Sequence, residues 1–228
     1  MTVVEETVPD YLYAYCERAG DPALWAEPLN AITNLAFMYF AYKAWQLWRG
    51  IDNKSFKRIG DIWVLTIAMF AIGIGSGLWH THAAPGWTVI ADVIPIYIFI
   101  NVAVVSIFMR LFKFNLWQSL GLWAIFQACN VSAEIFAPRD MLNGSMMYIP
   151  TWAMLGIVTF WLKQRGQDVW EQLWFVLQVF TASLLFRTMD IEVCDWNPFG
   201  THFLWHMLNA LVLYQIIEVL LKSRKATA

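Results

Sequence analysis

Seven apolar stretches of about 20 residues follow one another along the chain and limit its fold more than any other feature. A helix needs roughly 20 mostly apolar residues to cross a bilayer, because the hydrocarbon layer is about 30 Å thick and a helix rises about 1.5 Å per residue. The stretches cover residues 28–48, 62–80, 88–109, 116–137, 146–162, 173–189 and 201–221. We therefore predict an all-α integral membrane protein, a bundle of seven transmembrane helices.

The composition supports this prediction and excludes other classes. Of the 228 residues, 59% are hydrophobic and 14% are charged, whereas a soluble domain carries about 25% charged residues. The net charge of −2 argues against a nucleic-acid partner held by phosphate neutralisation. The connections are too short for a second domain, so we expect one domain over residues 1–228, with an N-terminal segment (1–27), the bundle (28–221) and a short tail (222–228).

The distribution of Lys and Arg predicts the orientation, because these residues are retained on the cytoplasmic side. With seven crossings, one set of loops and helix ends holds Arg49, Lys54, Lys57, Arg58, Arg110, Lys113, Lys163, Arg165, Lys222, Arg224 and Lys225. The opposite set holds only Arg18, Arg139 and Arg187. The N-terminus is thus expected outside the cytoplasm and the C-terminus inside it.

Polar residues gather near the non-cytoplasmic ends of the predicted helices. Ionisable groups inside a membrane are costly and are functional candidates by default. His202 and His206 are four residues apart and share one helix face, and His80 ends another helix at the same depth. A lone His-x-x-x-His pair is also found as interfacial histidines bonded to water. Three imidazoles, however, leave an open tetrahedral position for water, as in catalytic zinc sites.

Two further residues lie at this level. Ser76 is one turn from His80 on the same helix face, and Asp92 begins an otherwise apolar stretch. The alternatives are a helix serine bonded to its own backbone and an interfacial carboxylate. We treat His82 as a loop or surface residue. Other polar groups are interpreted as structural: Asn30, Thr33 and Asn34 as interhelical hydrogen-bonding residues, Asn130 and Glu134 likewise, and Arg187 with Asp190 as an ion pair.

Taken together, these residues resemble the alkaline ceramidase family, within the superfamily of seven-helix membrane hydrolases that includes the adiponectin and progestin receptors. The resemblance covers nearly the whole chain in order: Glu27-Pro-Leu-Asn30 with Asn34, Ser76-x-x-x-His80, Asp92, Arg187-x-x-Asp190 followed by Cys194, and His202-x-x-x-His206. It implies His80, His202 and His206 as zinc ligands, Asp92 as the general base, and Ser76 as a hydrogen-bond donor to the attacking water or the oxyanion.

The resemblance also bears on calcium and on a disulfide. Glu17 and Glu27 match two residues of the calcium site of animal ceramidases, but its aspartate and asparagine have no counterpart here, although Asp21 is a candidate substitute. Calcium therefore stays open. In the family an N-terminal cysteine is joined to one before the last helix, which implies a Cys16–Cys194 bridge worth about 4 kcal/mol. Two free thiols are the alternative.

The function expected on these grounds is zinc-dependent hydrolysis of ceramide or a related N-acyl lipid to a fatty acid and an amine. A lipid esterase of the same superfamily and a receptor or sensor with structural zinc are the alternatives. The partner is a membrane lipid substrate, with no nucleic acid and no obligate protein partner. The short loops favour a bacterial inner membrane with a periplasmic site, or a luminal site in an organelle membrane.

Overall fold

The computed structural model describes residues 9–50, 56–138 and 141–223, and these contain helices and no strand. The all-helical prediction is therefore confirmed. The α-helices are α1 (Pro28–Thr33), α2 (Leu35–Arg49), α3 (Phe56–His82), α4 (Trp87–Leu111), α5 (Leu116–Phe136), α6 (Ile149–Gln164), α7 (Val169–Met189) and α8 (His202–Lys222). Three short 3-10 helices accompany them: η1 (Asp10–Tyr13), η2 (Ser145–Tyr148) and η3 (Ile191–Val193).

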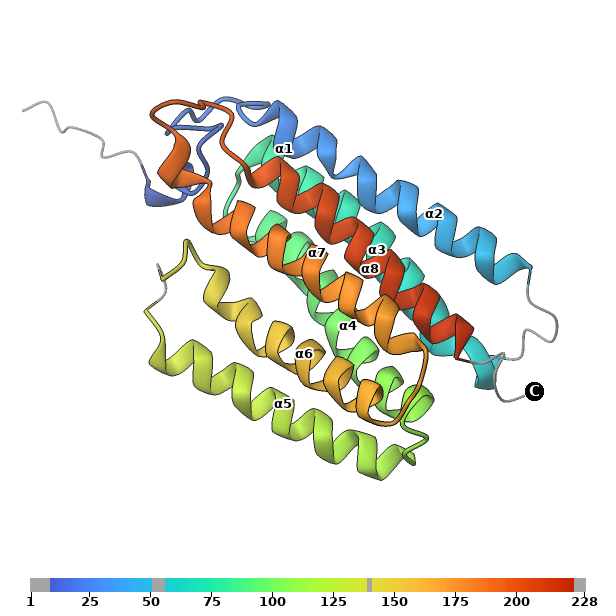
Figure 1. The fold of residues 1–228 in the computed structure, drawn as a ribbon. Helices are drawn as coiled ribbons and strands as arrows, with labels where there is room; N and C mark the ends of the chain where they lie inside the picture. Colours follow the sequence, from blue (N-terminus) through green and yellow to red (C-terminus); the bar gives the residue numbers. More distant parts are fainter. Residues whose placement is uncertain (1–8, 51–55, 139–140, 224–228) are drawn as a thin grey trace, which may run out of the picture.

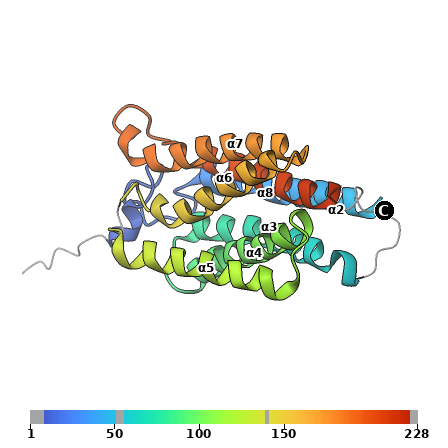
Figure 2. The same cartoon turned by 60° about the horizontal axis from the view of Figure 1, so that its bottom comes forward.

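The long helices lie side by side in an elongated bundle (Figures 1 and 2). Successive helices from α2 to α8 contact one another in chain order, and α8 returns to contact α2. Helix α8 also contacts α3 and α4, so it lies toward the inside of the bundle. The segment before α1, the loop before α8 and the end of α3 meet at one end of the bundle, where the polar candidates are found (Figure 1).

Five helices are long and apolar enough to cross a membrane: Ile59–His82, Trp87–Leu111, Ser145–Gln164, Val169–Met189 and His202–Lys222. Their outward faces carry exposed apolar side chains such as Ile90, Ile94 and Ile98 on α4. A water-soluble monomer rarely exposes contiguous apolar surface of this kind. The chain is therefore a helical membrane protein.

The other two predicted crossings coincide with α1–α2 and with α5. The first is broken at Asn34, which leaves α2 with 15 residues. Helix α5 has 21 residues and is not among the five helices that are long and apolar enough to cross a membrane, although Trp117 and Phe136 on it are more than four-fifths exposed. Helix α3 extends two residues past the predicted end at residue 80, so His82 lies in its last turn and not in a loop. Its side chain is exposed, as expected of a surface residue.

Candidate metal centre

Glycines let α3 approach its neighbours closely at the polar end of the bundle. A Cβ atom at Gly75 would lie 1.9 Å from the carbonyl oxygen of Ala91 on α4, and one at Gly73 would lie 2.8 Å from Cγ of Met38 on α2. Because contacts this short do not occur between real atoms, these positions require glycine. The close approach at Gly75 puts the next residue, Ser76, beside α4, where its hydroxyl hydrogen-bonds to the Asp92 carboxylate.

The three predicted metal ligands converge between α3 and α8. His80, His202 and His206 each offer a ring nitrogen, and these nitrogens lie within 4.8 Å of one another. The ring centroids are 4.7 to 5.2 Å apart. All three side chains are buried. Among the described residues this is the one group of three or more His, Cys, Asp or Glu side chains close enough to hold a metal ion.

Hydrogen bonds fix the tautomer of two of these histidines. His80 Nδ1 lies 2.5 Å from Oε2 of Glu27, and an ionised carboxylate can only accept, so Nδ1 carries the proton. His206 Nδ1 lies 3.1 Å from Oγ1 of Thr33. That hydroxyl already donates to the carbonyl oxygen of Leu29 at 2.7 Å, so it accepts from His206. In both rings Nε2 is left unprotonated and free to bind a cation.

His202 supplies the test of whether the group fits a metal. Its Nδ1 atom is buried and has no hydrogen-bond partner among the described residues. A buried ring nitrogen without a partner costs free energy unless something binds the ring. A metal ion bound to this nitrogen would satisfy it, and the rings of His80 and His206 offer their Nε2 atoms to the same ion. The residues present therefore fit a metal ion, and a set of three histidines suits zinc.

Glu27 is held by a buried arginine. Nε of Arg18 donates to Glu27 Oε1 at 2.5 Å, and Nη2 donates to the carbonyl oxygen of His80 at 3.0 Å. The amide of Asn30 donates to Glu27 Oε2 at 3.0 Å. Burial acts to raise the pKa of Glu27, but the bonds from His80 and Arg18 outweigh it and hold the pKa of that carboxyl below its usual value. Glu27 is therefore an ionised partner of His80.

This arrangement bears on the open question of calcium. Glu27 accepts hydrogen bonds from Arg18, His80 and Asn30. Glu17 accepts hydrogen bonds from the backbone N–H groups of Leu29 and Asn30 at 2.7 and 2.9 Å. Glu17 thereby satisfies free donors at the start of α1. Asp21 accepts from its own loop at Ala23. Neither Glu17 nor Glu27 belongs to a metal-sized acidic cluster among the described residues.

Asp190 fixes the start of α8. Its Oδ1 accepts the backbone N–H groups of Thr201 and His202 at 2.6 and 2.8 Å, and its Oδ2 accepts that of Cys16 at 3.0 Å. A carboxylate at a helix N-terminus is favoured by the free N–H groups and the helix dipole. Gly200 adopts φ +62°, and a Cβ there would lie 2.2 Å from Asp190 Oδ1. The predicted ion pair of Asp190 with Arg187 is thus wrong, because both Asp190 oxygens bind backbone groups.

A disulfide joins Cys16 to Cys194, with Cα atoms 5.5 Å apart. The bond places the adjacent residue, Tyr15, against the histidines. The Tyr15 ring centroid lies 4.7 Å from that of His80 and 4.4 Å from that of His202. Burial raises the pKa of the Tyr15 hydroxyl well above its usual value, so the phenol remains a neutral hydrogen-bond donor. Tyr15 was not predicted from the sequence as a site residue, although its position beside Cys16 was a usable signal.

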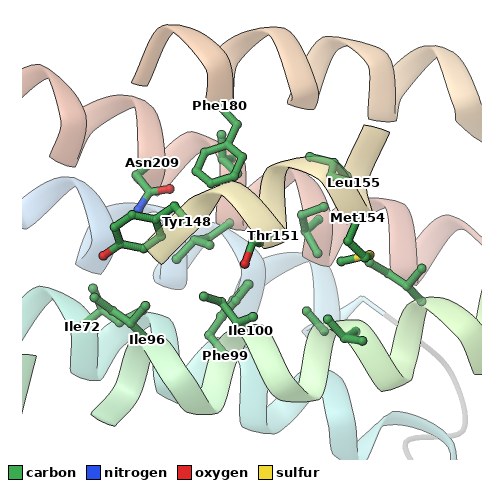
Figure 3. Close-up of a pocket in the computed structure, with 16 residues that line it drawn as sticks. Ile72, Ile96, Phe99, Ile100, Tyr148, Thr151, Met154, Leu155, Phe180 and Asn209 are labelled. Atoms are coloured by element: carbon green, nitrogen blue, oxygen red, sulfur yellow. The ribbon is translucent and has the colours of Figure 1, made fainter. Parts of the chain in front are cut away.

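Three cavities that share lining residues lie at this end of the bundle, and Tyr15, which contacts the rings of His80 and His202, lines one of them. A polar cavity of about 200 Å³ is lined by Tyr15, Asp92, Tyr148 and Arg187, among others. An apolar cavity of about 70 Å³ adjoins it between α3, α4, α6 and α8. Figure 3 shows the apolar cavity, with Thr151 and Asn209 as polar groups among isoleucine, leucine and phenylalanine side chains. The two share Tyr148 and Thr151 in their walls. A third, outer cavity shares Tyr97, Asn130, Met147 and Arg187 with the polar one.

The fold and the site define a class of protein: a helical membrane protein with a buried three-histidine group that can hold a metal ion. Comparisons with known proteins add no relative to this description, since no protein-family model matches the chain and no curated protein does.

Proposed function

We propose that this protein is a zinc-dependent membrane amidohydrolase that cleaves ceramide or a related N-acyl lipid to a fatty acid and an amine. The observation that carries the proposal is the convergence of three buried histidine rings next to Tyr15, which contacts two of them and lines the same cavity as Asp92. Buried histidines at the end of a membrane bundle need a reason, because polar groups are expensive there. A metal ion opposite a carboxylate provides one.

The chain's own residues supply the ligands and their orientation. The proposed ligands are Nε2 of His80 and of His206, with a ring nitrogen of His202. Glu27 and Thr33 hold the first two rings by their Nδ1–H groups. Such outer partners set the ring orientation and raise the basicity of the ligand nitrogen. A zinc ion at this position supplies Lewis-acid polarisation of a carbonyl and activates water for attack.

Asp92 is the proposed general base and acid. It lines the polar cavity, and Ser76 hydrogen-bonds to it. A carboxylate in this position accepts the proton of the attacking water and returns it to the nitrogen of the leaving amine. The contact with Asp92 supports a role for Ser76 in orienting that carboxylate. Donation from Ser76 to the water or the oxyanion, which the resemblance implies, stays a prediction.

The cavities support a lipid as the substrate. Asp92 lines the polar cavity, and the adjoining apolar cavity is lined mainly by branched aliphatic and aromatic side chains (Figure 3). A volume of about 70 Å³ suits part of a slender acyl chain. An amide bond in the polar cavity would let its acyl chain occupy the apolar one.

The proposal includes seven crossings, with the site on the non-cytoplasmic side. Helices α1–α2 and α5 lie alongside the five apolar spans (Figure 1). The described basic residues of the larger set lie at the end of the bundle opposite the histidines. This arrangement favours a cytoplasmic C-terminus. Membership of the alkaline ceramidase family belongs to the same proposal and rests on the motifs quoted above.

Turnover of a lipid panel tests the proposed function. Purified protein in detergent is given N-acyl and O-acyl lipids, with and without a chelator, and its zinc content is measured in parallel. We expect about one zinc per chain, chelator-sensitive amide hydrolysis, loss of zinc in His206→Ala, and loss of turnover with zinc retained in Asp92→Asn. Ester hydrolysis without amide hydrolysis indicates the esterase alternative. Bound zinc with no turnover indicates the sensor, and absence of zinc rejects the proposal.

A further inference from the structure

Arg187 lies where the polar cavity meets the outer cavity and lines both. It belongs to the last turn of α7, which is one of the five apolar spans. An arginine keeps its charge in every protein environment. A charge in a membrane span is usually balanced by a partner of opposite sign or serves a function. The partners of Arg187 therefore decide what this residue does.

No described carboxylate forms an ion pair with Arg187, although Asp92, which lines the same polar cavity, interacts with it electrostatically. Its Nη1 donates to the carbonyl oxygen of Asn143 at 3.0 Å, and it also hydrogen-bonds to Tyr148. The carboxylate of Asp190, three residues further on, accepts hydrogen bonds from backbone N–H groups instead. Glu134 lines the outer cavity but forms no ion pair with Arg187. With one donor on Asn143 and one on Tyr148, about three of the five guanidinium donors have no partner among the described residues.

A purely structural role explains this arrangement poorly. The guanidinium carbon lies 5.8 Å from the ring centroids of both Tyr148 and Trp205, near the outer limit of about 6 Å for a cation–π interaction. A single carbonyl and a phenol do not neutralise the charge, and Asp92 in the same cavity offsets part of it without a direct ion pair. An anion in the cavity would neutralise it and could form two parallel hydrogen bonds, which is the geometry that guanidinium offers to carboxylate and phosphate.

The order of the cavities indicates which part of a lipid would carry that anion. The apolar cavity suits the acyl chain, and Asp92 marks the scissile bond in the polar cavity. Arg187 lines the junction with the outer cavity, so the amine side of the amide would pass it. We propose that Arg187 forms an anion-binding headgroup subsite, so that the preferred substrates are N-acyl lipids whose amine part bears a carboxylate or a phosphate, ahead of ceramide, whose amine part is neutral. This inference rests on the proposed hydrolase function.

Substrates that share one acyl chain test the subsite. N-palmitoylglycine, N-palmitoylethanolamine and its O-phosphate differ only in the headgroup and therefore separate carboxylate, neutral and phosphate recognition. Hydrogen bonds to charged groups are worth enough to expect at least a tenfold higher kcat/KM for an anionic substrate than for the neutral one. Arg187→Gln should bring this ratio close to one, mainly by raising KM for the anionic substrate, and Arg187→Lys should retain part of it. Arg165→Gln, at the opposite end of the bundle, is the matched control and should keep the full ratio.

Three outcomes overturn the inference. These are a wild-type preference for the neutral lipid, equal rates on all three lipids, or an Arg187→Gln variant that loses all activities by the same factor. In the last case Arg187 supports the fold, and the thermal unfolding midpoint of the variant should fall with the activity.

A binding measurement separates this inference from the proposed function. Hexadecyloxyacetate and 2-(hexadecyloxy)ethanol cannot be hydrolysed and differ in one carboxylate. Tighter binding of the acid by wild-type protein, lost in Arg187→Gln and kept in Arg165→Gln, supports the anion subsite even if no lipid is turned over. Acid binding that survives Arg187→Gln means that the carboxylate binds elsewhere, for example on the metal, and rejects the subsite.

Discussion

Replacing Glu27 by glutamine tests the chain of contacts that leads from Arg18 to the metal centre. Glutamine keeps the size of the side chain but has one acceptor oxygen where the carboxylate has two. Glu27 accepts from Nε of Arg18 and from Nδ1 of His80 on different oxygens, both at 2.5 Å. An amide can accept only one of these bonds and directs its NH₂ group at the other donor.

The expected magnitudes follow from burial and charge. Loss of an outer carboxylate partner of a metal-binding histidine costs about 10- to 100-fold in metal affinity, which is about 1.4 to 2.7 kcal/mol. Arg18 is 2% exposed, and removing one partner of a buried ion pair costs about 3 to 5 kcal/mol of folding stability. We expect Glu27→Gln to lower both the zinc affinity and the stability of the zinc-free protein.

Two measurements on purified protein separate these effects: zinc affinity by competition with a chromogenic chelator, and thermal unfolding of the zinc-free form. Glu17→Gln is the matched control, because Glu17 accepts backbone N–H groups of α1 and does not contact His80. It should lower stability and leave zinc affinity unchanged. The double variant Arg18→Gln, Glu27→Gln removes the unpaired buried charge, so it should recover stability without recovering affinity. A Glu27→Gln protein that binds zinc within about twofold of wild type would refute the reasoning.

Three further predictions follow from the packing and the topology. Gly75→Ala should lower the thermal unfolding midpoint strongly, because the new Cβ would lie 1.9 Å from a backbone oxygen. Gly121→Ala is the control and should leave the midpoint unchanged, because no atom lies within 4 Å of a Cβ there. Equal midpoints for the two variants would contradict the close α3–α4 contact. Reduction of the Cys16–Cys194 bridge, which spans 178 residues, should lower the free energy of unfolding by about 4 to 5 kcal/mol. Free thiols on both cysteines in non-reducing mass spectrometry would exclude the bond. A reporter fused to the C-terminus should be active only in the cytoplasm if the proposed orientation is correct, and activity on the other side would reverse it.

Much of the helical architecture was predictable because it depends on local properties. The five apolar spans overlap predicted stretches, and their ends shift by only a few residues. The break at Asn34 was missed, because the apolar pattern continues through it and nothing in the local sequence stops a helix there. His80, His202 and His206 were predicted to meet because they share a depth, and the structure brings their ring nitrogens within 4.8 Å of one another.

The partners of these histidines were less accessible to sequence analysis. Thr33 was assigned to general interhelical hydrogen bonding, yet its hydroxyl meets Nδ1 of His206, which is 173 positions away. Arg187 and Asp190 were paired because they are three residues apart on one helix. The fold instead places the backbone N–H groups of Thr201 and His202 at Asp190. Free backbone donors at a helix start compete for a nearby carboxylate, and sequence spacing does not reveal where that helix start will lie.

The sequence by itself determined that this protein is a bundle of apolar helices with histidines near one end, because bilayer thickness and helical periodicity act on short stretches of chain. Only the tertiary structure decided which ring nitrogens face a common centre, which carboxylate holds each group and which buried side chains pair with one another. These depend on contacts between segments far apart in the chain, such as Arg18 with Glu27 and His80. Close packing permits such contacts only at certain positions, and the glycines at 75 and 200 make two of them possible.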